Sequence, residues 1–368
     1  MGNVKKTSLY ESHLKSGGKI VDFAGYSLPI QYEGIIEEHN AVRNAAGIFD
    51  VSHMGEVQVK GKDALKYLQH MVTNDLGRLT KNQVIYSLMC YEDGGVVDDL
   101  LIYKADDDYF FLVVNAGNKE KDYMWLQDNA KGYDVSLNNV SDSISEVAVQ
   151  GPKAEEILQK LTDQDLSQIK FFCFMQDIDL AGVKVMISRT GYTGEDGFEI
   201  YADNEGIKKI WDEILNSGKD SGIKPTGLGC RDTLRFEANL PLYGNELSKD
   251  ITPLEAGYGY FVKLTKDDFI GKDALKKQKE EGLKRKIIGF KMEDRGIPRH
   301  GYSVFSGDKE IGFVTTGYYS PTLKESIGLA MVNIEHSNLG DEISIQVRNK
   351  FLKAKVVSRK FLVKNYKK

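Results

Sequence analysis

Polar and apolar residues alternate along three neighbouring segments in the first third of the chain, at 83–90, 96–103 and 109–115. Alternation with a period of two is typical of β-strands, and the short spacers between the segments favour hairpins. Residues 57–69 and 147–159 each combine a short apolar run, a Gly turn and a helical apolar period, and 271–278 is a third Gly-to-helix passage. Strands interleaved with helices in this way predict α+β sheets with helices on one side.

The pattern changes after about residue 283. Before that point a further helix is expected at 204–216, where Ile207, Ile210, Trp211 and Ile214 recur at helical spacing. From residue 286 onward, short alternating stretches are separated by turn signals and few helical periods remain. We therefore expect a mixed helix-and-strand portion at 1–282 and a small all-β barrel or sandwich at 283–368.

Composition limits the class of protein. The chain has 368 residues, of which 41% are hydrophobic and 28% charged, and its net charge is −5. This length exceeds one typical core, so two or three domains are expected. A spread negative charge argues against a nucleic-acid groove, and no apolar run is long enough to predict a membrane span. Three distant cysteines and an N-terminus without a signal or transit pattern favour the cytoplasm of a prokaryote or a mature organellar form.

Signatures of several cofactors can be excluded. The glycine-rich segment 191–197 lacks the G-x-G opening of a dinucleotide fingerprint, and a strand pattern follows it where a helix is required. No phosphate-binding G-x-x-x-x-G-K-[ST] loop and no nucleophile elbow occur, and the six histidines have no metal-ligand spacing. Apart from His53, they are expected to be surface or hydrogen-bonded core residues. The remaining candidates for chemistry are carboxylates, tyrosines and arginines, which suits an enzyme that binds and polarises reactive substrates.

Two adjacent carboxylates, Asp98 and Asp99, interrupt the apolar strand predicted at 96–103. Side chains alternate across a strand, so one of the two should face the covered side of the sheet and the other should point away. A buried carboxylate is costly unless a cation or a hydrogen-bond donor meets it. The alternative is a solvated strand end without function.

Four other passages carry unusual sets of polar side chains, and each has a simpler explanation. Residues 48–55 contain His53 and Met54 and also fit the start of a strand; 111–122 place two Asn around Ala-Gly, where Asn can cap a helix. In 188–201, a glycine-rich loop precedes a strand that carries Glu199. The carboxylate of Glu199 could bind the polar edge of a guanidine-like or pterin-like group, or it could simply face water. The helix predicted at 227–239 carries Arg231 and Arg235, for which internal ion pairs are the alternative.

Together these passages resemble the aminomethyltransferase (T protein) family of the glycine cleavage system. The likeness extends from about residue 7 to 363, includes a C-terminal module, and is carried by motifs that follow the family's order. These are Leu9-Tyr-Glu-Ser-His13, residues 23–32, Phe49-Asp-Val-Ser-His-Met-Gly55, Gly94-Gly-Val-Val-Asp-Asp-Leu100, Asn115-Ala-Gly-Asn118, Thr190-Gly-Tyr-Thr-Gly-Glu-Asp-Gly197, Gly229-Cys-Arg-Asp-Thr-Leu-Arg235 and Gly317-Tyr-Tyr-Ser-Pro321.

The resemblance implies a three-domain cloverleaf, with two intertwined α+β domains in the N-terminal portion, a C-terminal β-barrel and a central folate channel. The implied activity is transfer of the methylene carbon from the aminomethyl-lipoyl arm of H protein to tetrahydrofolate. The products are 5,10-methylenetetrahydrofolate, ammonia and dihydrolipoyl H protein. Tetrahydrofolate is implied as a co-substrate, with no metal, flavin or nucleotide. Lipoylated H protein is the implied partner, with the glycine decarboxylase and dihydrolipoyl dehydrogenase components as further partners.

The resemblance also assigns residues. Asp99 matches the essential carboxylate near the reacting folate nitrogen, and Asp98 is its close neighbour on the folate side. Glu199 matches the acid that grips the amino-pyrimidine edge of the pterin, for which a bidentate acceptor suits adjacent N–H donors. The other matches to the folate pocket are Met54, Tyr86, Val113, Asn115, Tyr192 and Arg231.

The sequence departs from the family at two places. Tyr26 stands where the family commonly has Trp, and the C-terminal residues 358–366 differ from the usual form, so that Arg359 is only a candidate folate contact. One alternative function is a folate-dependent demethylation module, but such modules accompany a flavin domain and usually lack the Asp pair. Another is a folate-binding accessory protein for iron–sulfur enzyme maturation, but its Lys-Gly-Cys-Tyr-type motif is absent here.

Overall fold

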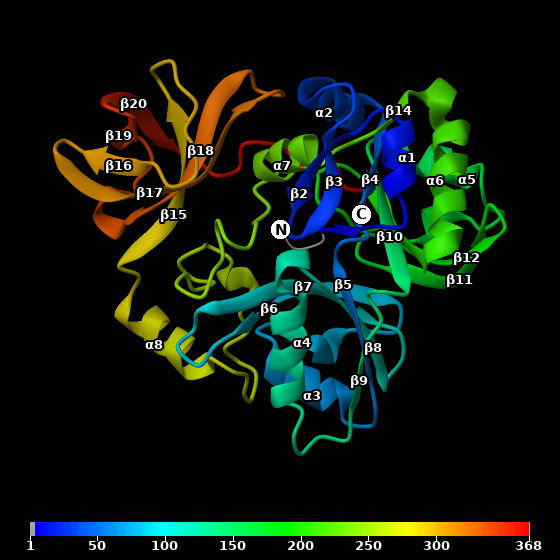
Figure 1. Ribbon diagram of the computed structural model, residues 1–368. Coiled ribbons are helices and arrows are strands. Elements are labelled where there is room, and N and C mark those ends of the chain that lie inside the picture. Colours follow the sequence, from blue (N-terminus) through cyan, green and yellow to red (C-terminus); the bar gives the residue numbers. More distant parts are fainter. Residues whose placement is uncertain (1–3, 368) are drawn as a thin grey trace.

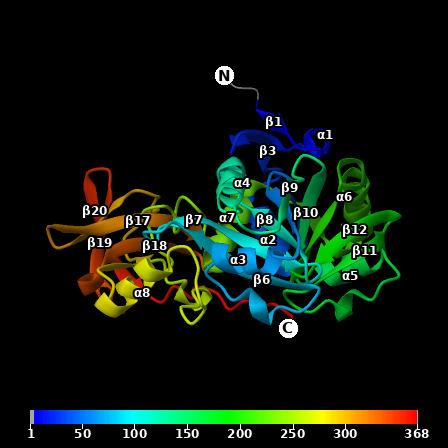
Figure 2. The same cartoon turned by 90° about the horizontal axis from the view of Figure 1, so that it is seen from below.

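The computed structural model describes residues 4–367, which form three lobes around a common centre (Figure 1). A small sheet near the N-terminus lies over one face of the molecule (Figure 2). In this sheet β3 (Tyr26–Gln31) pairs with β1 (Lys5–Lys6) in parallel and with β2 (Lys19–Phe23) in antiparallel orientation. Helix α1 (Tyr10–Lys15) lies between β1 and β2 in the chain, and α2 (Ile35–Asn44) follows β3.

A six-stranded sheet forms the second layer of the N-terminal portion. Apolar residues alternate along its central strands, and Val147, Val149, Phe198 and Ile200 point to one face, where they pack against α5 and α6. The order across this sheet is β11 (Phe174–Leu180), β12 (Val183–Ser188), β13 (Gly197–Asp203), β10 (Ile144–Gln150), β4 (Ala46–Asp50) and β14 (Ile223–Pro225). Helices α5 (Ala154–Gln159) and α6 (Asn204–Gly218) cover this sheet, and α7 (Leu228–Glu237) packs against α2 and β3.

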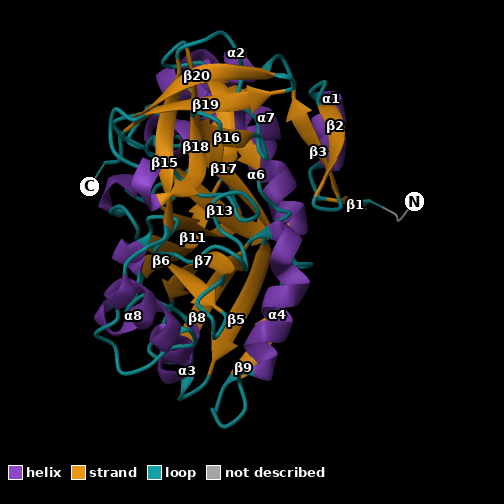
Figure 3. Cartoon of the chain, turned by 90° about the vertical axis from the view of Figure 1, so that its left-hand side faces the viewer, coloured by secondary structure: helices purple, strands orange, loops and turns teal. Residues whose placement is uncertain are grey.

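A five-stranded sheet lies beside it, in the lower half of Figure 3. Its helix-covered face holds an apolar core that includes Val57, Val59, Leu112 and Leu126. The order is β6 (Gln83–Cys90), β7 (Val96–Lys104), β8 (Tyr109–Val114), β5 (Gly55–Lys60) and β9 (Ser136–Asn139), with α3 (Ala64–Met71) and α4 (Lys119–Asp128). The chain enters the six-stranded sheet with β4, builds the five-stranded sheet, and returns with β10. The two units are therefore intertwined, as expected.

The uncovered faces of the two large sheets meet through aromatic side chains. Tyr103 of β7 and Phe111 of β8 contact Tyr201 of β13, with ring-centroid distances of 5.8 and 5.7 Å. Phe174 of β11 completes the cluster at 5.2 Å from Tyr103. Met54 and Val113 pack at the same interface. Residues at alternate positions of both sheets thus face each other across a buried layer.

The C-terminal part is a closed six-stranded barrel, as the change of pattern near residue 283 predicts. It follows α8 (Lys272–Glu281) and consists of β15 (Arg285–Met292), β18 (Glu325–Asn333), β17 (Lys309–Ser320), β16 (Ser303–Ser306), β19 (Glu342–Val347) and β20 (Lys350–Val357). Beyond β20 the chain returns toward the six-stranded sheet, where Tyr366 stacks on Phe171 at 4.4 Å (Figure 2).

The fold thus has the expected α+β class and barrel. Across residues 4–367, the helices are too short or too polar to cross a membrane. The same residues contain no cluster of three or more His, Cys, Asp or Glu side chains that could hold a metal ion.

Candidate active site

The hairpin of β6 and β7 positions the two adjacent aspartates. Its turn needs glycine twice: Gly94 has a φ of +88°, and a Cβ at Gly95 would lie 1.9 Å from the carbonyl oxygen of Lys249. The turn therefore fixes where β7 begins and which way each aspartate points. Asp98 is fully buried, whereas Asp99 is partly exposed, as alternation along a strand requires.

Both carboxylates are bound by asparagines that follow β8. Asn115 donates from its backbone N–H to Asp98 Oδ2 at 3.0 Å, and its side-chain amide lies 2.9 Å from Oδ1 of Asp98 and of Asp99. Asn118 donates to Asp98 Oδ1 at 2.7 Å. The expectation that an asparagine here caps the helix is wrong for Asn118, which stands at the N-cap position of α4 without a capping bond. Its amide has the buried carboxylate as a stronger partner.

Asp99 has an unusual ionisation. Tyr86 donates from its hydroxyl to Asp99 Oδ2 at 3.0 Å. Burial, followed by the neighbouring charge of Asp98, raises the pKa of Asp99 to about 7, although the bonds from Tyr86 and Asn115 oppose this shift. A carboxyl group with this pKa is divided between both protonation states near neutral pH, which is typical of groups that take part in chemistry.

Asp122 lies behind this pair and was not singled out from the sequence. It is fully buried, and within residues 4–367 neither of its carboxyl oxygens has a hydrogen-bond partner. Burial, followed by the charge of Asp98, raises the pKa of Asp122 to about 11, so the group is neutral. Its position four residues after Asn118, on the same face of α4, is the signal that would have indicated it.

Glu199 approaches the centre from the opposite sheet. It lies on β13 and accepts a hydrogen bond from Thr190 Oγ1 at 2.5 Å. Burial raises the pKa of Glu199, whereas Thr190, the charge of Arg231 and the hydroxyl of Tyr103 oppose the rise. These three groups favour the ionised carboxylate, which is the form that can accept bonds from a row of N–H donors.

Arg231 and Arg235 lie four residues apart on α7 but differ in their surroundings. Arg235 is 1% exposed and pairs with Asp232 at 2.7 Å and Glu246 at 2.8 Å, so the internal ion pair is the correct explanation for this residue. Arg231 stacks on Tyr192, with 4.9 Å from its guanidinium carbon to the ring centroid. No salt bridge of Arg231 is found within residues 4–367, and its planar fork remains available to a ligand.

The other sequence-predicted residues join these two halves. Tyr86 packs edge-on against Phe261 at 4.7 Å, and Tyr192 donates from its hydroxyl to the carbonyl of Pro241. Burial raises the pKa of Tyr192, whereas the charge of Arg235 lowers it and that of Asp99 raises it further. Met54 and Val113 supply apolar surface at the sheet interface. The structure thus joins Tyr86, Asp98, Asp99 and Asn115 by hydrogen bonds and stacks Arg231 on Tyr192. The assignment of the nine predicted residues to one site stays a prediction.

Arg359, the other folate candidate from the sequence, has structural partners. Arg359 donates to the carbonyl of Ala256 at 2.5 Å and lies 5.7 Å from the ring of Tyr258, which ties the end of the barrel to the preceding loop. The histidines outside the site are hydrogen-bonded core residues where buried: His13 bonds Asp50 at 2.8 Å. His53 is 1% exposed, and burial, followed by the charge of Arg231, lowers its pKa to about 3, so it is neutral.

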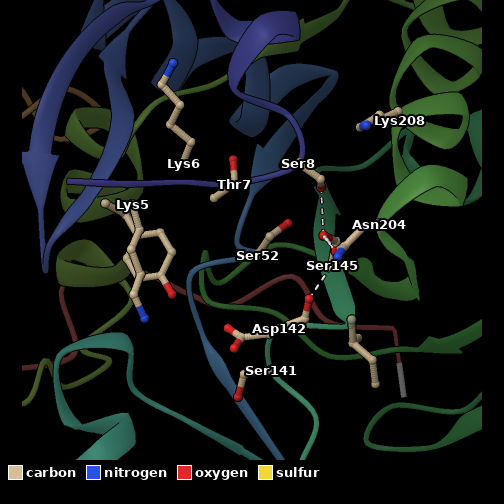
Figure 4. A pocket seen from close by; sticks show the side chains of 12 residues that line it. Lys5, Lys6, Thr7, Ser8, Ser52, Ser141, Asp142, Ser145, Asn204 and Lys208 are labelled. Atoms are coloured by element: carbon tan, nitrogen blue, oxygen red, sulfur yellow. Dashed lines mark hydrogen bonds between the residues drawn. The ribbon is translucent and has the colours of Figure 1, made fainter. Parts of the chain in front are cut away.

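A separate pocket of about 440 Å³ opens beside the N-terminal strands (Figure 4). Lysines, hydroxyls and amides line it, among them Lys5, Ser8, Ser145 and Asn204, and hydrogen bonds join the last three in a row. None of the nine predicted residues is among those that line it. The pocket is therefore distinct from the candidate active site.

Comparisons with known proteins agree with this geometry. The family profile described as "GCVT N-terminal domain" matches residues 9–266, and "Glycine cleavage T-protein C-terminal barrel domain" matches residues 285–362. A protein of Thermoanaerobacter pseudethanolicus named "Aminomethyltransferase" is 62% identical over the full length of both chains. One of Clostridium botulinum with the same name is 57% identical over the full length of both chains.

Solved structures give the same result. The crystal structure of glycine cleavage system aminomethyltransferase T from Bartonella henselae superposes with a TM-score of 0.93 and 32% sequence identity, and the match covers 99% of this chain and all of that one. Matched profiles, full-length relatives and a shared fold lead to one conclusion. The chain belongs to the glycine cleavage T-protein family and functions as a tetrahydrofolate-dependent aminomethyltransferase.

Proposed function

We propose that this chain takes the methylene carbon from the aminomethyl group on the lipoyl arm of H protein and transfers it to tetrahydrofolate. In this reaction the C–N and C–S bonds of the aminomethyl group are replaced by bonds to N5 and N10 of tetrahydrofolate. The protons that N5 and N10 of tetrahydrofolate lose end on ammonia and on the released thiol. We further propose a division at residues 282/283, a cytoplasmic location, and glycine decarboxylase and dihydrolipoyl dehydrogenase as further partners.

The residues at the centre fit a reduced folate. Glu199 offers carboxyl oxygens as acceptors for the N–H donors of the amino-pyrimidine edge, and Arg231 offers a guanidinium without an ion-pair partner within residues 4–367. Met54 and Val113 provide an apolar floor, and Tyr86 and Tyr192 provide aromatic faces. This set suits a flat, polar-edged ring with an apolar face.

Asp99 carries the chemical part of the proposal. Positive charge develops on the one-carbon unit as ammonia leaves, and a fixed carboxylate in a site shielded from water stabilises such charge strongly. Tyr86 and Asn115 hold both oxygens of Asp99 in place, so little reorganisation is needed during the reaction. The proposal rests on one observation: the hydrogen bonds from Tyr86 and Asn115 hold the carboxyl group of Asp99 beside a surface that suits folate.

The function is tested by mixing the purified chain with aminomethylated H protein and tetrahydrofolate. We expect 5,10-methylenetetrahydrofolate and ammonia to form in equal amounts. Binding of tetrahydrofolate without any product would contradict the proposal and favour a folate-binding accessory role.

Glu199→Gln is expected to weaken tetrahydrofolate binding by about 10- to 100-fold, because a charge-assisted hydrogen bond is lost and an amide N–H₂ then faces the donors of the ligand. Isothermal titration calorimetry measures the change. Glu205→Gln, at an exposed position on α6, is the matched control and should bind as the wild type does. Equal affinities for Glu199→Gln and wild type would remove Glu199 from the binding surface.

The transfer rate is expected to depend on pH through Asp99. Below its pKa of about 7 the group is protonated and neutral, so kcat should fall about tenfold for each pH unit below this value and level off above it. Asp99→Asn should remove this acid limb and leave a low, flat profile. A wild-type profile that is flat between pH 5 and 8 would contradict the assignment.

A further inference from the structure

A chain of buried hydroxyl groups leads away from Glu199 into the layer between the sheets. Thr190 Oγ1 lies 2.5 Å from Glu199 Oε2, and Ser188 Oγ lies 2.6 Å from Thr190 Oγ1. Tyr103 Oη follows at 3.2 Å from Ser188 Oγ. Ser188 and Tyr103 are fully buried and Thr190 is 3% exposed, so these groups bond to one another rather than to bulk water.

The chain continues to a second buried acid. Tyr201 Oη lies 2.8 Å from Tyr103 Oη. Glu146 stands directly opposite Tyr201 in the pairing of β10 with β13, on the same face of the sheet, and is 2% exposed. Within residues 4–367, Glu146 Oε2 has no hydrogen-bond partner. Burial, followed by the charge of Glu199, raises the pKa of Glu146 well above its usual range and so favours its protonated form.

The direction of every bond in this chain follows from the number of protons. Thr190 donates to Glu199, whose carboxyl oxygen accepts. Because each hydroxyl has one proton, Ser188 then donates to Thr190, Tyr103 to Ser188 and Tyr201 to Tyr103. The oxygen of Tyr201 is left as an acceptor, and Glu146 stands opposite Tyr201 in the pairing of β10 with β13. Bonds that all run in one direction polarise one another and strengthen the last bond, to Glu199.

We propose that Thr190, Ser188, Tyr103, Tyr201 and Glu146 form a positioning network that fixes the ionisation and orientation of Glu199 toward the 2-amino-pyrimidinone edge of its substrate. The proposal rests on the binding role proposed for Glu199 above. It adds that affinity for this edge is determined by hydroxyls that do not touch the ligand. Tyr103 and Tyr201 are thus positioning residues that set specificity for pterins that carry a 2-amino group.

The test compares the binding of two ligands to the wild type and to two variants. Tetrahydrofolate and an analogue without the 2-amino group are titrated by calorimetry into wild type, Tyr103→Phe and Tyr201→Phe. We expect Tyr103→Phe to raise the Kd of tetrahydrofolate about three- to tenfold and Tyr201→Phe to raise it less, with the Kd of the analogue unchanged. Tyr67→Phe is the control, because this buried tyrosine donates to the carbonyl of Leu126 in the core of the five-stranded sheet.

A pH series adds a readout that loss of packing would not change. The groups that face Glu199 are Arg231 from α7, Glu146 from β10, Tyr103 from β7 and Thr190. Loss of the Tyr103 hydroxyl should move the acid limb of tetrahydrofolate binding to higher pH, and Tyr67→Phe should not. Equal weakening of both ligands, or no weakening of either, would overturn the network. Failure of wild type to bind tetrahydrofolate would instead overturn the proposed function.

Discussion

Asp99→Asn is expected to lower the rate of ammonia release from aminomethylated H protein by roughly 100- to 1,000-fold at saturating tetrahydrofolate. The amide is nearly the same size as the carboxyl group and can still bond to Tyr86, but it carries no negative charge for the cationic one-carbon unit. Because Glu199 and Arg231 are untouched, the Kd of tetrahydrofolate should stay close to that of wild type. Stopped-flow or coupled ammonia assays with calorimetry on the same preparations measure both quantities.

The neighbouring aspartate gives a control for position. Asp98 is bound by three N–H groups of Asn115 and Asn118 and is fully buried, so Asp98→Asn should lower stability and thereby disturb Asp99 indirectly. A large loss of rate in Asp98→Asn with none in Asp99→Asn would transfer the chemical role from Asp99 to Asp98.

Arg235→Met is expected to lower the free energy of unfolding by about 3–5 kcal/mol, because it leaves the buried carboxylate of Glu246 without its cation. Arg235 also reaches Thr316 on β17 at 3.2 Å, so the loss should loosen the contact of α7 with the barrel. Denaturant unfolding monitored by fluorescence measures the change.

Two further variants test whether the loss of stability in Arg235→Met comes from an uncompensated charge at a buried position. Arg78→Met removes the cation of a pair in which the arginine side chain is 82% exposed, and it should change stability by at most about 1 kcal/mol. Adding Glu246→Gln to Arg235→Met should restore part of the lost stability, since the uncompensated charge is then gone. Additive losses in the double variant would show that the ion pair is not the cause.

Much of the fold could be predicted from the sequence, because the local pattern carries the information. The alternating apolar residues of β6, β7 and β8 predict a hairpin sheet, and Ile207, Ile210 and Trp211 predict the buried face of α6. The adjacent Asp98 and Asp99 also indicate a special site without structural data, because charges in a strand need partners. The resemblance to a family then supplied the remaining site residues.

Other features could not be predicted because they depend on packing between distant segments. Arg231 and Arg235 share one helix and similar sequence surroundings, yet only Arg235 meets Glu246, which follows the helix in a loop. Tyr103 and Tyr201 have the sequence pattern of ordinary strand residues, and their 2.8 Å contact exists only because two separate sheets pack face to face. For Asp122 the spacing from Asn118 is a signal in the sequence, but its burial beside Asp98 depends on packing.

The most direct measurement of the central claim is ammonia release from aminomethylated H protein by the purified chain, with and without tetrahydrofolate. A folate-dependent transferase that uses Asp99 should release ammonia rapidly only when tetrahydrofolate is present, and Asp99→Asn should abolish this dependence while it still binds the folate. Tight binding of tetrahydrofolate by the wild type with no acceleration of release would contradict the account.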